Sequence, residues 1–131
     1  MITNTRNFKF EEFQCRHCGE NKIQQVVLEL CQKIRDFVGR PIIITSGYRC
    51  PEHNRKIGGV PNSSHVKGLS ANLKCSIGAE ALYIAIQSLY DLGEIQELKS
   101  CYYKKTFVHV DCDCGQKGNH EIFQGYDKRS Y

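Results

Sequence analysis

The sequence predicts a single small α+β domain in which helices flank a sheet. Three observations lead to this class. The chain has 131 residues and 40% of them are hydrophobic, which suffices for one core but not for two typical domains. One long segment carries apolar residues at helical spacing. Several short segments have the β-branched composition or the alternation of strands. We therefore expect residues 1–131 to form one domain.

The clearest helix follows a short aromatic segment and a turn at residues 15–19. Asn21 is the expected N-cap of this helix, and Gly39 with Pro41 behind it ends the helix. Apolar residues recur between these limits every three or four positions, at Ile23, Val26, Val27, Leu30, Ile34 and Phe37. This apolar stripe predicts packing against a core and implies no chemistry.

Strand patterns come next along the chain. Residues 41–45 form a β-branched run that predicts a buried strand, and residues 50–64, with two prolines and a glycine pair, predict a loop. Residues 69–74 alternate between apolar and polar side chains, which predicts a half-buried strand with Asn72 on its polar face.

The last third of the chain predicts one more helix and one more strand. Apolar residues on one face indicate a helix from Ala79 to Leu92, which Gly93 ends. A strand is expected at about residues 106–112, and the tail at residues 115–131 is expected to be a weakly ordered extension or an edge element.

Charge and hydropathy exclude some functions. Eighteen lysines and arginines against 14 acidic residues give a mild net charge of +4 that is spread along the chain, so no nucleic acid is expected as a partner. No stretch approaches the ~20 apolar residues that span a bilayer. The first eight residues lack the pattern of a secretory signal, so we expect the protein to be cytoplasmic as synthesised.

Two segments together spell most of a zinc site. Residues 63–68 read S-x-H-x-x-G, and Asn72 follows on the expected strand. His109 and Asp111 lie two positions apart, so on a strand both side chains point to the same face. A zinc enzyme typically uses three protein ligands and leaves one position for water. The combination predicts a metal site that no single one of these residues would predict.

Further stretches extend this pattern to a family. Residues 45–49 read T-S-G-Y-R, residues 51–54 read P-E-H-N, and residues 57–65 lead into the histidine motif. In order and spacing, the chain from about residue 8 to residue 112 resembles the zinc D-alanyl-D-alanine carboxypeptidases and related phage endolysins, which share a fold with the hedgehog signalling domain. The resemblance implies a central, mainly antiparallel sheet flanked by helices.

The resemblance also implies roles for matching residues. His65 and His109 occupy the positions of two zinc ligands, and Asn72 occupies that of the third. Arg49 matches the arginine that holds a carboxylate or carbonyl oxygen of the substrate, where a fixed charge would stabilise a developing oxyanion. Ser63 matches the motif serine of the substrate-binding loop, which it supports. The implied substrate is a stem peptide of peptidoglycan, and the implied cofactor is zinc.

Two positions depart from the family. The third ligand in the family is an aspartate, and the neutral Asn72 should lower zinc affinity because zinc prefers thiolate, imidazole or carboxylate. Several relatives place an acidic general base three positions before the last histidine, where this chain has Thr106. Asp111 is the nearest remaining carboxylate, and it is expected to act either as the base or as a partner that orients His109.

Three explanations of Asn72 therefore stay open: an engineered inactivating change, a natural loss of activity, or a variation that an active enzyme tolerates. They correspond to two hypotheses of function. The first is a zinc peptidase of cell-wall peptides, which would reach the wall only through lysis or another export route. The second is a catalytically inactive, peptidase-like binding module, for example one encoded by a phage, that holds a peptide or protein partner in the former substrate cleft.

Eight cysteines raise the prospect of a second metal. The C-x-x-C and C-x-C pairs offer four thiolates for a structural zinc ion, at Cys15, Cys18, Cys112 and Cys114. Disulfide pairing and free thiols are the alternatives. Cys31 falls near the apolar stripe of the first helix and is expected in the core.

Overall fold

The computed structural model describes residues 2–114 and 121–128. Its helices are a short 3-10 helix η1 (Phe10–Phe13), α1 (Gln25–Val38), α2 (Pro51–Lys56) and α3 (Ala79–Asp91). Its strands are β1 (Ile42–Ser46), β2 (Ser70–Cys75), β3 (Ser100–Tyr103), β4 (Val108–Asp111) and β5 (Phe123–Tyr126). The strands form one sheet in the order β1-β2-β4-β3-β5. Every neighbouring pair is antiparallel except β3 with β5. The predicted α+β class with a mainly antiparallel sheet is confirmed.

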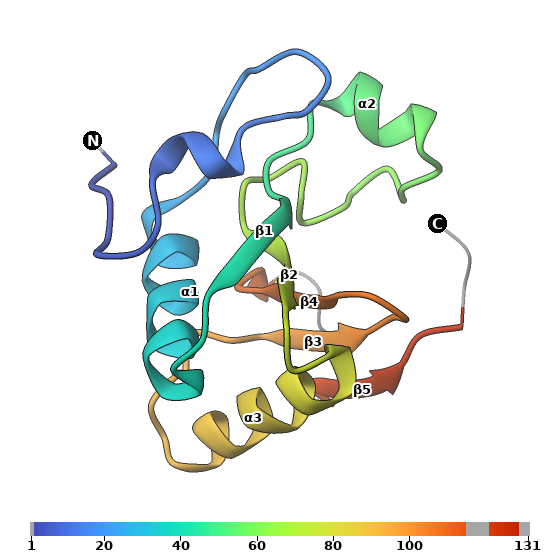
Figure 1. The fold of residues 1–131 in the computed structure, drawn as a ribbon. Helices are drawn as coiled ribbons and strands as arrows, with labels where there is room; N and C mark the ends of the chain where they lie inside the picture. Colours follow the sequence, from blue (N-terminus) through green and yellow to red (C-terminus); the bar gives the residue numbers. More distant parts are fainter. Residues whose placement is uncertain (1, 115–120, 129–131) are drawn as a thin grey trace.

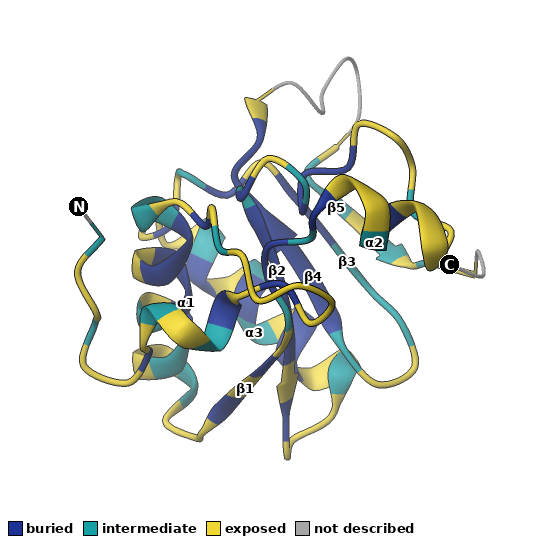
Figure 2. Ribbon diagram, turned by 90° about the horizontal axis from the view of Figure 1, so that it is seen from above, coloured by how far each residue is buried: buried dark blue, intermediate teal, exposed yellow. Residues whose placement is uncertain are grey.

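The sheet divides the molecule into two sides. Helices α1 and α3 lie on one side, and α2 with the long connection that follows it lies on the other (Figures 1 and 2). The core fills the space between the sheet and helices α1 and α3. Strand β4 is buried along its length and β2 at every residue but Lys74, so the strand predicted as half-buried is mostly buried (Figure 2). Val108 and Val110 belong to this core, so the alternate residues of β4 face the other side.

Helix α1 confirms the apolar stripe but begins later than predicted. Asn21 is not its N-cap, because the helix starts at Gln25 after an extended Gln24. The side chain of Asn21 instead donates to the carbonyl oxygen of Phe10 and accepts from the N–H of Ile23. These bonds fix the segment that leads into the helix. At the other end, Gly39 takes the left-handed conformation with φ of 73° and ends α1 as predicted.

The segment predicted as a loop at residues 50–64 contains helix α2. Cys50 is the N-cap, and its sulfur accepts a hydrogen bond from the N–H of His53 at 3.3 Å. Pro51 then occupies the first turn, where a missing N–H costs nothing. The composition suggested a loop because the helix is only six residues long and has a proline at its start. Residues 57–64 are irregular as predicted, and the irregular segment continues to Leu69, so β2 begins one residue later than expected.

After helix α3 the sequence predicts one strand, which corresponds to β4, whereas the structure also contains β3 and β5. Strand β3 was missed because it is four residues long and directly follows a charged, polar stretch. Strand β5, in the predicted tail, is an edge strand and so fits one of the two alternatives for that segment. Residues 115–120 and 129–131 of the tail lie outside the described residues. Within the described part of the chain, no helix is both long and apolar enough to cross a bilayer.

Candidate functional site

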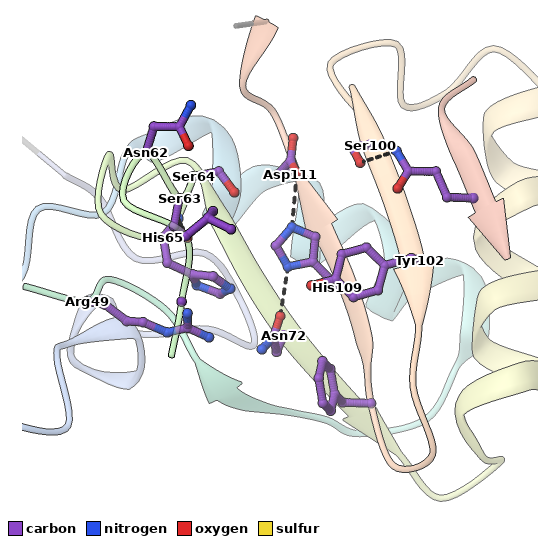
Figure 3. A pocket seen from close by; sticks show the side chains of 14 residues that line it. Arg49, Asn62, Ser63, Ser64, His65, Asn72, Ser100, Tyr102, His109 and Asp111 are labelled. Atoms are coloured by element: carbon purple, nitrogen blue, oxygen red, sulfur yellow. Dashed lines mark hydrogen bonds and ion pairs between the residues drawn. The ribbon is translucent and has the colours of Figure 1, made fainter. Parts of the chain in front are cut away.

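A pocket of about 340 Å³ opens on the side of the sheet that carries α2 (Figure 3). The lining includes all the residues that the sequence suggested for the zinc and substrate site: Arg49, Ser63, His65, Asn72, His109 and Asp111. These residues come from the end of β1, the irregular connection, β2 and β4. Segments that are far apart in sequence therefore meet at one place.

Strand pairing places two of the three predicted ligands. Asn72 on β2 lies directly opposite His109 on β4 in the antiparallel register. Residues opposite each other in such a pair share a face and lie close together. The oxygen Oδ1 of Asn72 lies 2.9 Å from Nδ1 of His109, within hydrogen-bond distance (Figure 3).

The third predicted ligand, His65, is held by a tight turn in front of β2. The hydroxyl of Ser63 accepts a hydrogen bond from the N–H of His65 at 3.2 Å, which fits the supporting role expected of this serine. Gly68 ends the turn with φ of 72°, and a Cβ there would lie 2.0 Å from the carbonyl oxygen of Lys22. Only glycine meets both requirements, so the turn depends on it.

The ring of His65 directs one nitrogen into the pocket without a partner. Its Nδ1 donates to the carbonyl oxygen of Gly47 at 2.8 Å, so Nε2 carries the lone pair of the neutral ring. Nε2 is buried and has no hydrogen-bond partner. Burial, followed by the nearby charges of His109 and Arg49, holds the pKa of His65 well below its usual value. The neutral ring is the form that binds metals.

The ring of His109 contacts a side chain at each nitrogen and a third side chain on its face. Its Nε2 donates to Oδ2 of Asp111 at 3.0 Å, so the neutral ring carries its lone pair on Nδ1. That lone pair would face the oxygen of Asn72, and two acceptors repel each other unless a proton or a cation lies between them. Tyr102 stacks on the ring, with centroids 4.6 Å apart and planes 12° apart.

The chemistry of the donor set fits a metal ion, and its lack of negative charge would weaken the binding. The partnerless Nε2 of His65 and the Nδ1 of His109 belong to rings whose centroids are 5.1 Å apart, and the oxygen of Asn72 completes three donors. Two imidazoles suit zinc, and the hydrogen bond from His109 to Asp111 is the usual way in which a carboxylate orients a ligating histidine. The amide contributes no charge, which removes much of the attraction for the ion.

Arg49 lines the pocket, and two hydrogen bonds hold its side chain in place. Its Nε donates to Oγ of Ser46 at 3.3 Å and its Nη1 donates to Oδ1 of Asn54 at 3.2 Å. Burial lowers the pKa of the guanidinium from its usual value, but an arginine remains charged at neutral pH. The pocket therefore contains a fixed cation beside the candidate metal donors.

Asp111 uses both carboxylate oxygens for internal bonds. Oδ2 accepts from His109, and Oδ1 accepts from the backbone N–H of Asp113 at 3.2 Å. The side chain is buried, and among the residues that line the pocket it is the sole carboxylate. Thr106, at the position of the family's general base, is exposed and is absent from the lining.

Two residues near the site gave no signal in sequence. Tyr102 escaped notice because it belongs to the missed strand β3, where it pairs with His109. Cys50 escaped because it has no cysteine near it in sequence. By contrast, Tyr48 packs in a small buried cluster with Cys15 and Cys50, which fits a role in packing.

The cysteines meet in a different combination from the one expected. Among the described residues, the group of three or more potential metal ligands within 4.8 Å of one another consists of Cys15, Cys18 and Cys50. Cys112 and Cys114 are described but do not belong to it. Burial raises the pKa of Cys112 to about 12, so this thiol stays protonated at neutral pH. Cys31 is fully buried in the core as expected.

Comparison with known proteins agrees with the geometry of the pocket. No curated protein matches the chain. A protein-family model with the description Peptidase M15 matches residues 6–111, which include the end of β1, the histidine turn, β2 and β4. M15 peptidases are zinc enzymes that act on cell-wall peptides. Because the match spans well over half of the 131 residues, the chain belongs to the Peptidase M15 family.

Proposed function

We propose that this protein is a zinc-dependent peptidase of bacterial cell-wall peptides that holds its metal weakly. The observation that carries the proposal is the buried Nε2 of His65, which makes no hydrogen bond, in a ring whose centroid lies 5.1 Å from that of His109 in the pocket. Burying an imidazole lone pair without a partner costs stability, so such an atom indicates a site built for a ligand. His65, Asn72 and His109 would hold the ion.

A zinc ion bound by these residues would supply a water of lowered pKa, near 7, and would polarise a carbonyl group. The chain itself contributes the fixed charge of Arg49. Its bonds to Ser46 and Asn54 hold the guanidinium in place before substrate arrives, and a preorganised cation costs little reorganisation during reaction. Arg49 would bind the carboxylate of a stem peptide or the carbonyl oxygen on which negative charge develops.

Asp111 acts in this proposal as a positioning residue for His109. Its two oxygens are occupied by His109 and by the N–H of Asp113, so neither is directed at a substrate. A carboxylate that accepts from a ligating histidine fixes the tautomer that leaves Nδ1 available to metal. The alternative, that Asp111 is the general base, requires one of these bonds to break.

A binding module without catalysis is the second candidate, and Asn72 and Thr106 favour it. An asparagine side chain can turn its amide N–H toward His109, so it satisfies the ring without a metal, whereas an aspartate cannot. Thr106 cannot act as the general base that relatives carry at its position. In this case the pocket and Arg49 would still bind a peptide with a free carboxylate.

Hydrolysis measured with and without the family's aspartate tests the proposal. Wild type and Asn72→Asp are incubated with purified muropeptides and excess zinc, and released amino acids and peptides are identified by mass spectrometry. We expect zinc-dependent cleavage by both proteins, with faster cleavage by Asn72→Asp. His109→Ala is the negative control.

Three results would decide between the candidates. Cleavage by Asn72→Asp alone would make the natural chain a binding module derived from a peptidase. Failure of both proteins to cleave or to bind zinc at the pocket would reject the peptidase assignment of this site. Binding of muropeptides without zinc, lost in Arg49→Ala, would support the module.

A further inference from the structure

The cysteine group of Cys15, Cys18 and Cys50 lies outside the pocket and has no part in the proposed reaction. Cys15 and Cys18 belong to the turn that follows η1. Cys50 comes after β1 in the sequence and is the N-cap of α2. Figure 1 shows the N-terminal loop folding over to the start of α2. The three sulfurs lie within 4.8 Å of one another.

The spacing of these sulfurs is close to that of a tetrahedral zinc site. Two thiolates bound at ~2.3 Å with a tetrahedral angle would be about 3.8 Å apart, so only a small contraction of the group is needed. The group also contains an odd number of thiols. One disulfide would therefore leave a third thiol beside it, whereas one metal ion uses all three.

Backbone N–H groups point at the sulfurs, as they do where thiolates carry charge. The N–H of Cys50 donates to the sulfur of Cys15 at 3.4 Å, and the N–H of His53 donates to the sulfur of Cys50 at 3.3 Å. The turn itself is closed by two bonds, from Cys15 N–H to the Glu20 carbonyl and from Gly19 N–H to the Cys15 carbonyl. The loop is thus preorganised around the sulfurs.

A histidine is available as the fourth ligand. The Nδ1 of His17 lies 3.7 Å from the sulfur of Cys50, and a nitrogen and a sulfur on one tetrahedral zinc ion would be about 3.6 Å apart. The His17 ring stacks on that of His53, with centroids 5.7 Å apart and planes 4° apart. No ring nitrogen of His17 lies within 4.8 Å of all three sulfurs, so the ring must move toward Cys15 and Cys18 to complete the site. His17 is exposed, so this movement need not disturb the core.

We propose that Cys15, Cys18 and Cys50 bind a structural zinc ion, with His17 as the fourth ligand, and that this ion fastens the N-terminal turn to the chain segment that carries Arg49. Three thiolates and one imidazole are a usual donor set for closed, structural zinc sites. Cys50 directly follows Arg49, whose N–H donates to the carbonyl oxygen of His65 at 3.2 Å. The ion would thereby support one wall of the pocket.

The proposal is tested by counting zinc in a protein that lacks the pocket site. The full chain with His65→Ala and His109→Ala is purified under reducing conditions, and its metals are measured by inductively coupled plasma mass spectrometry. We expect one zinc ion per chain. Adding Cys50→Ser should lower zinc affinity by more than about tenfold, the least that loss of an outer-shell partner costs, whereas adding the exposed Cys114→Ser should leave it unchanged.

Cobalt substitution tests the ligands without relying on a cysteine variant that folds poorly. The cobalt form of the same pocket-deficient protein should show thiolate-to-cobalt charge-transfer bands and the intense visible bands of a tetrahedral site. His17→Ala should shift the visible bands, and His53→Ala should not. The proposal is overturned if the protein contains no zinc and a Cys15–Cys18 disulfide is found by mass spectrometry, or if Cys50→Ser retains zinc at wild-type affinity.

Discussion

The pocket and the cysteine group are two sets of metal donors that the chain assembles in different ways. In the pocket, Asn72 and His109 are opposite residues of two buried strands, so the register of the sheet sets their separation. The cysteine group joins two surface segments that are 35 residues apart in sequence, and its geometry depends on turns and a helix cap. Strands of the sheet therefore position the donors of the pocket. Loops position the donors of the cysteine group, whose proposed ion joins the N-terminal turn to the segment that carries Arg49.

The donors of the two sites also differ in charge. The pocket offers two imidazoles and an amide, none of which can be an anion, whereas the cysteine group offers up to three thiolates. Burial alone would raise the pKa of Cys15, but hydrogen bonds from the backbone of Cys50, Cys18 and His17 lower it to about 7. Since an anionic ligand attracts a divalent ion far more than a neutral one, the same protein should bind zinc tightly at the cysteine group and weakly in the pocket.

The largest expected effect comes from giving the pocket the charge it lacks. Asn72→Asp should raise zinc affinity at the pocket by about a hundredfold or more, because a first-shell charge outweighs the outer-shell partners whose loss costs 10–100-fold. Isothermal titration with zinc measures the change. Asn62→Asp is the matched control, since it adds the same charge to the same pocket at a position that lines it without being a predicted ligand. Equal gains in both variants would mean that general electrostatics, and not ligation, sets the affinity.

A second prediction concerns Gly68, which ends the turn that holds His65 in the pocket. Gly68→Ala should destabilise the protein by about 2 kcal/mol, because it combines the strain of a positive φ with a clash against the carbonyl of Lys22. Urea unfolding measures the loss. Gly39→Ala is the control, because Gly39 has nearly the same φ, 73°, but no atom within 4 Å of the added Cβ. If the two variants lose equal stability, the close approach to Lys22 contributes nothing.

The same contrast between strand-built and loop-built sites explains which features could be predicted from the sequence. His65, Asn72 and His109 could be predicted together because local structure fixes the spacing within their motifs. A turn has a fixed length and a strand has a period of two, so the motifs can be recognised in the sequence. Helices α1 and α3 were predicted because their apolar faces repeat over three or more turns. Contacts that a single residue makes with a residue distant in sequence produce no such repeating pattern, so they could not be predicted.

Cys50 and Asn21 illustrate what sequence periodicity leaves out. Cys50 reaches Cys15 only because the end of β1 lies beside the N-terminal turn, where the N–H of Tyr48 donates to the carbonyl oxygen of Phe13 at 2.7 Å. Nothing local in the sequence encodes that approach. Asn21 has the composition of an N-cap, but tertiary contacts with Phe10 use its side chain instead. The sequence suggested Cys112 and Cys114 as partners because their short spacing is visible in the chain, whereas the fold brings the isolated Cys50 to Cys15 and Cys18.

A third prediction separates the two roles of Asp111. As a positioning residue, Asp111→Asn should lower the zinc affinity of the pocket by about tenfold, because the amide orients His109 less firmly and makes its ring less basic. A general base would instead change the rate of hydrolysis with zinc affinity intact. Titration of zinc and hydrolysis at saturating zinc, both in the Asn72→Asp background, distinguish these results. Asp113→Asn, a nearby buried carboxylate that pairs with Lys67, is the control.

The smallest expected effect is the cost of keeping His65 neutral in the metal-free pocket. Its pKa in the folded protein is well below 6.5, chiefly because of burial, so below pH 6.5 the unfolded chain binds a proton that the folded chain refuses. Stability is therefore retained above pH 6.5 and lost as the pH falls, by about 0.7 kcal/mol between pH 7 and pH 6. Urea unfolding of the metal-free protein at the two pH values, compared with His65→Gln, measures this part. An unchanged pH dependence in His65→Gln would mean that the folded protein accommodates a charged His65. In that case the free nitrogen would not be reserved for a metal, and the pocket would lose the property that separates it from an ordinary surface cleft.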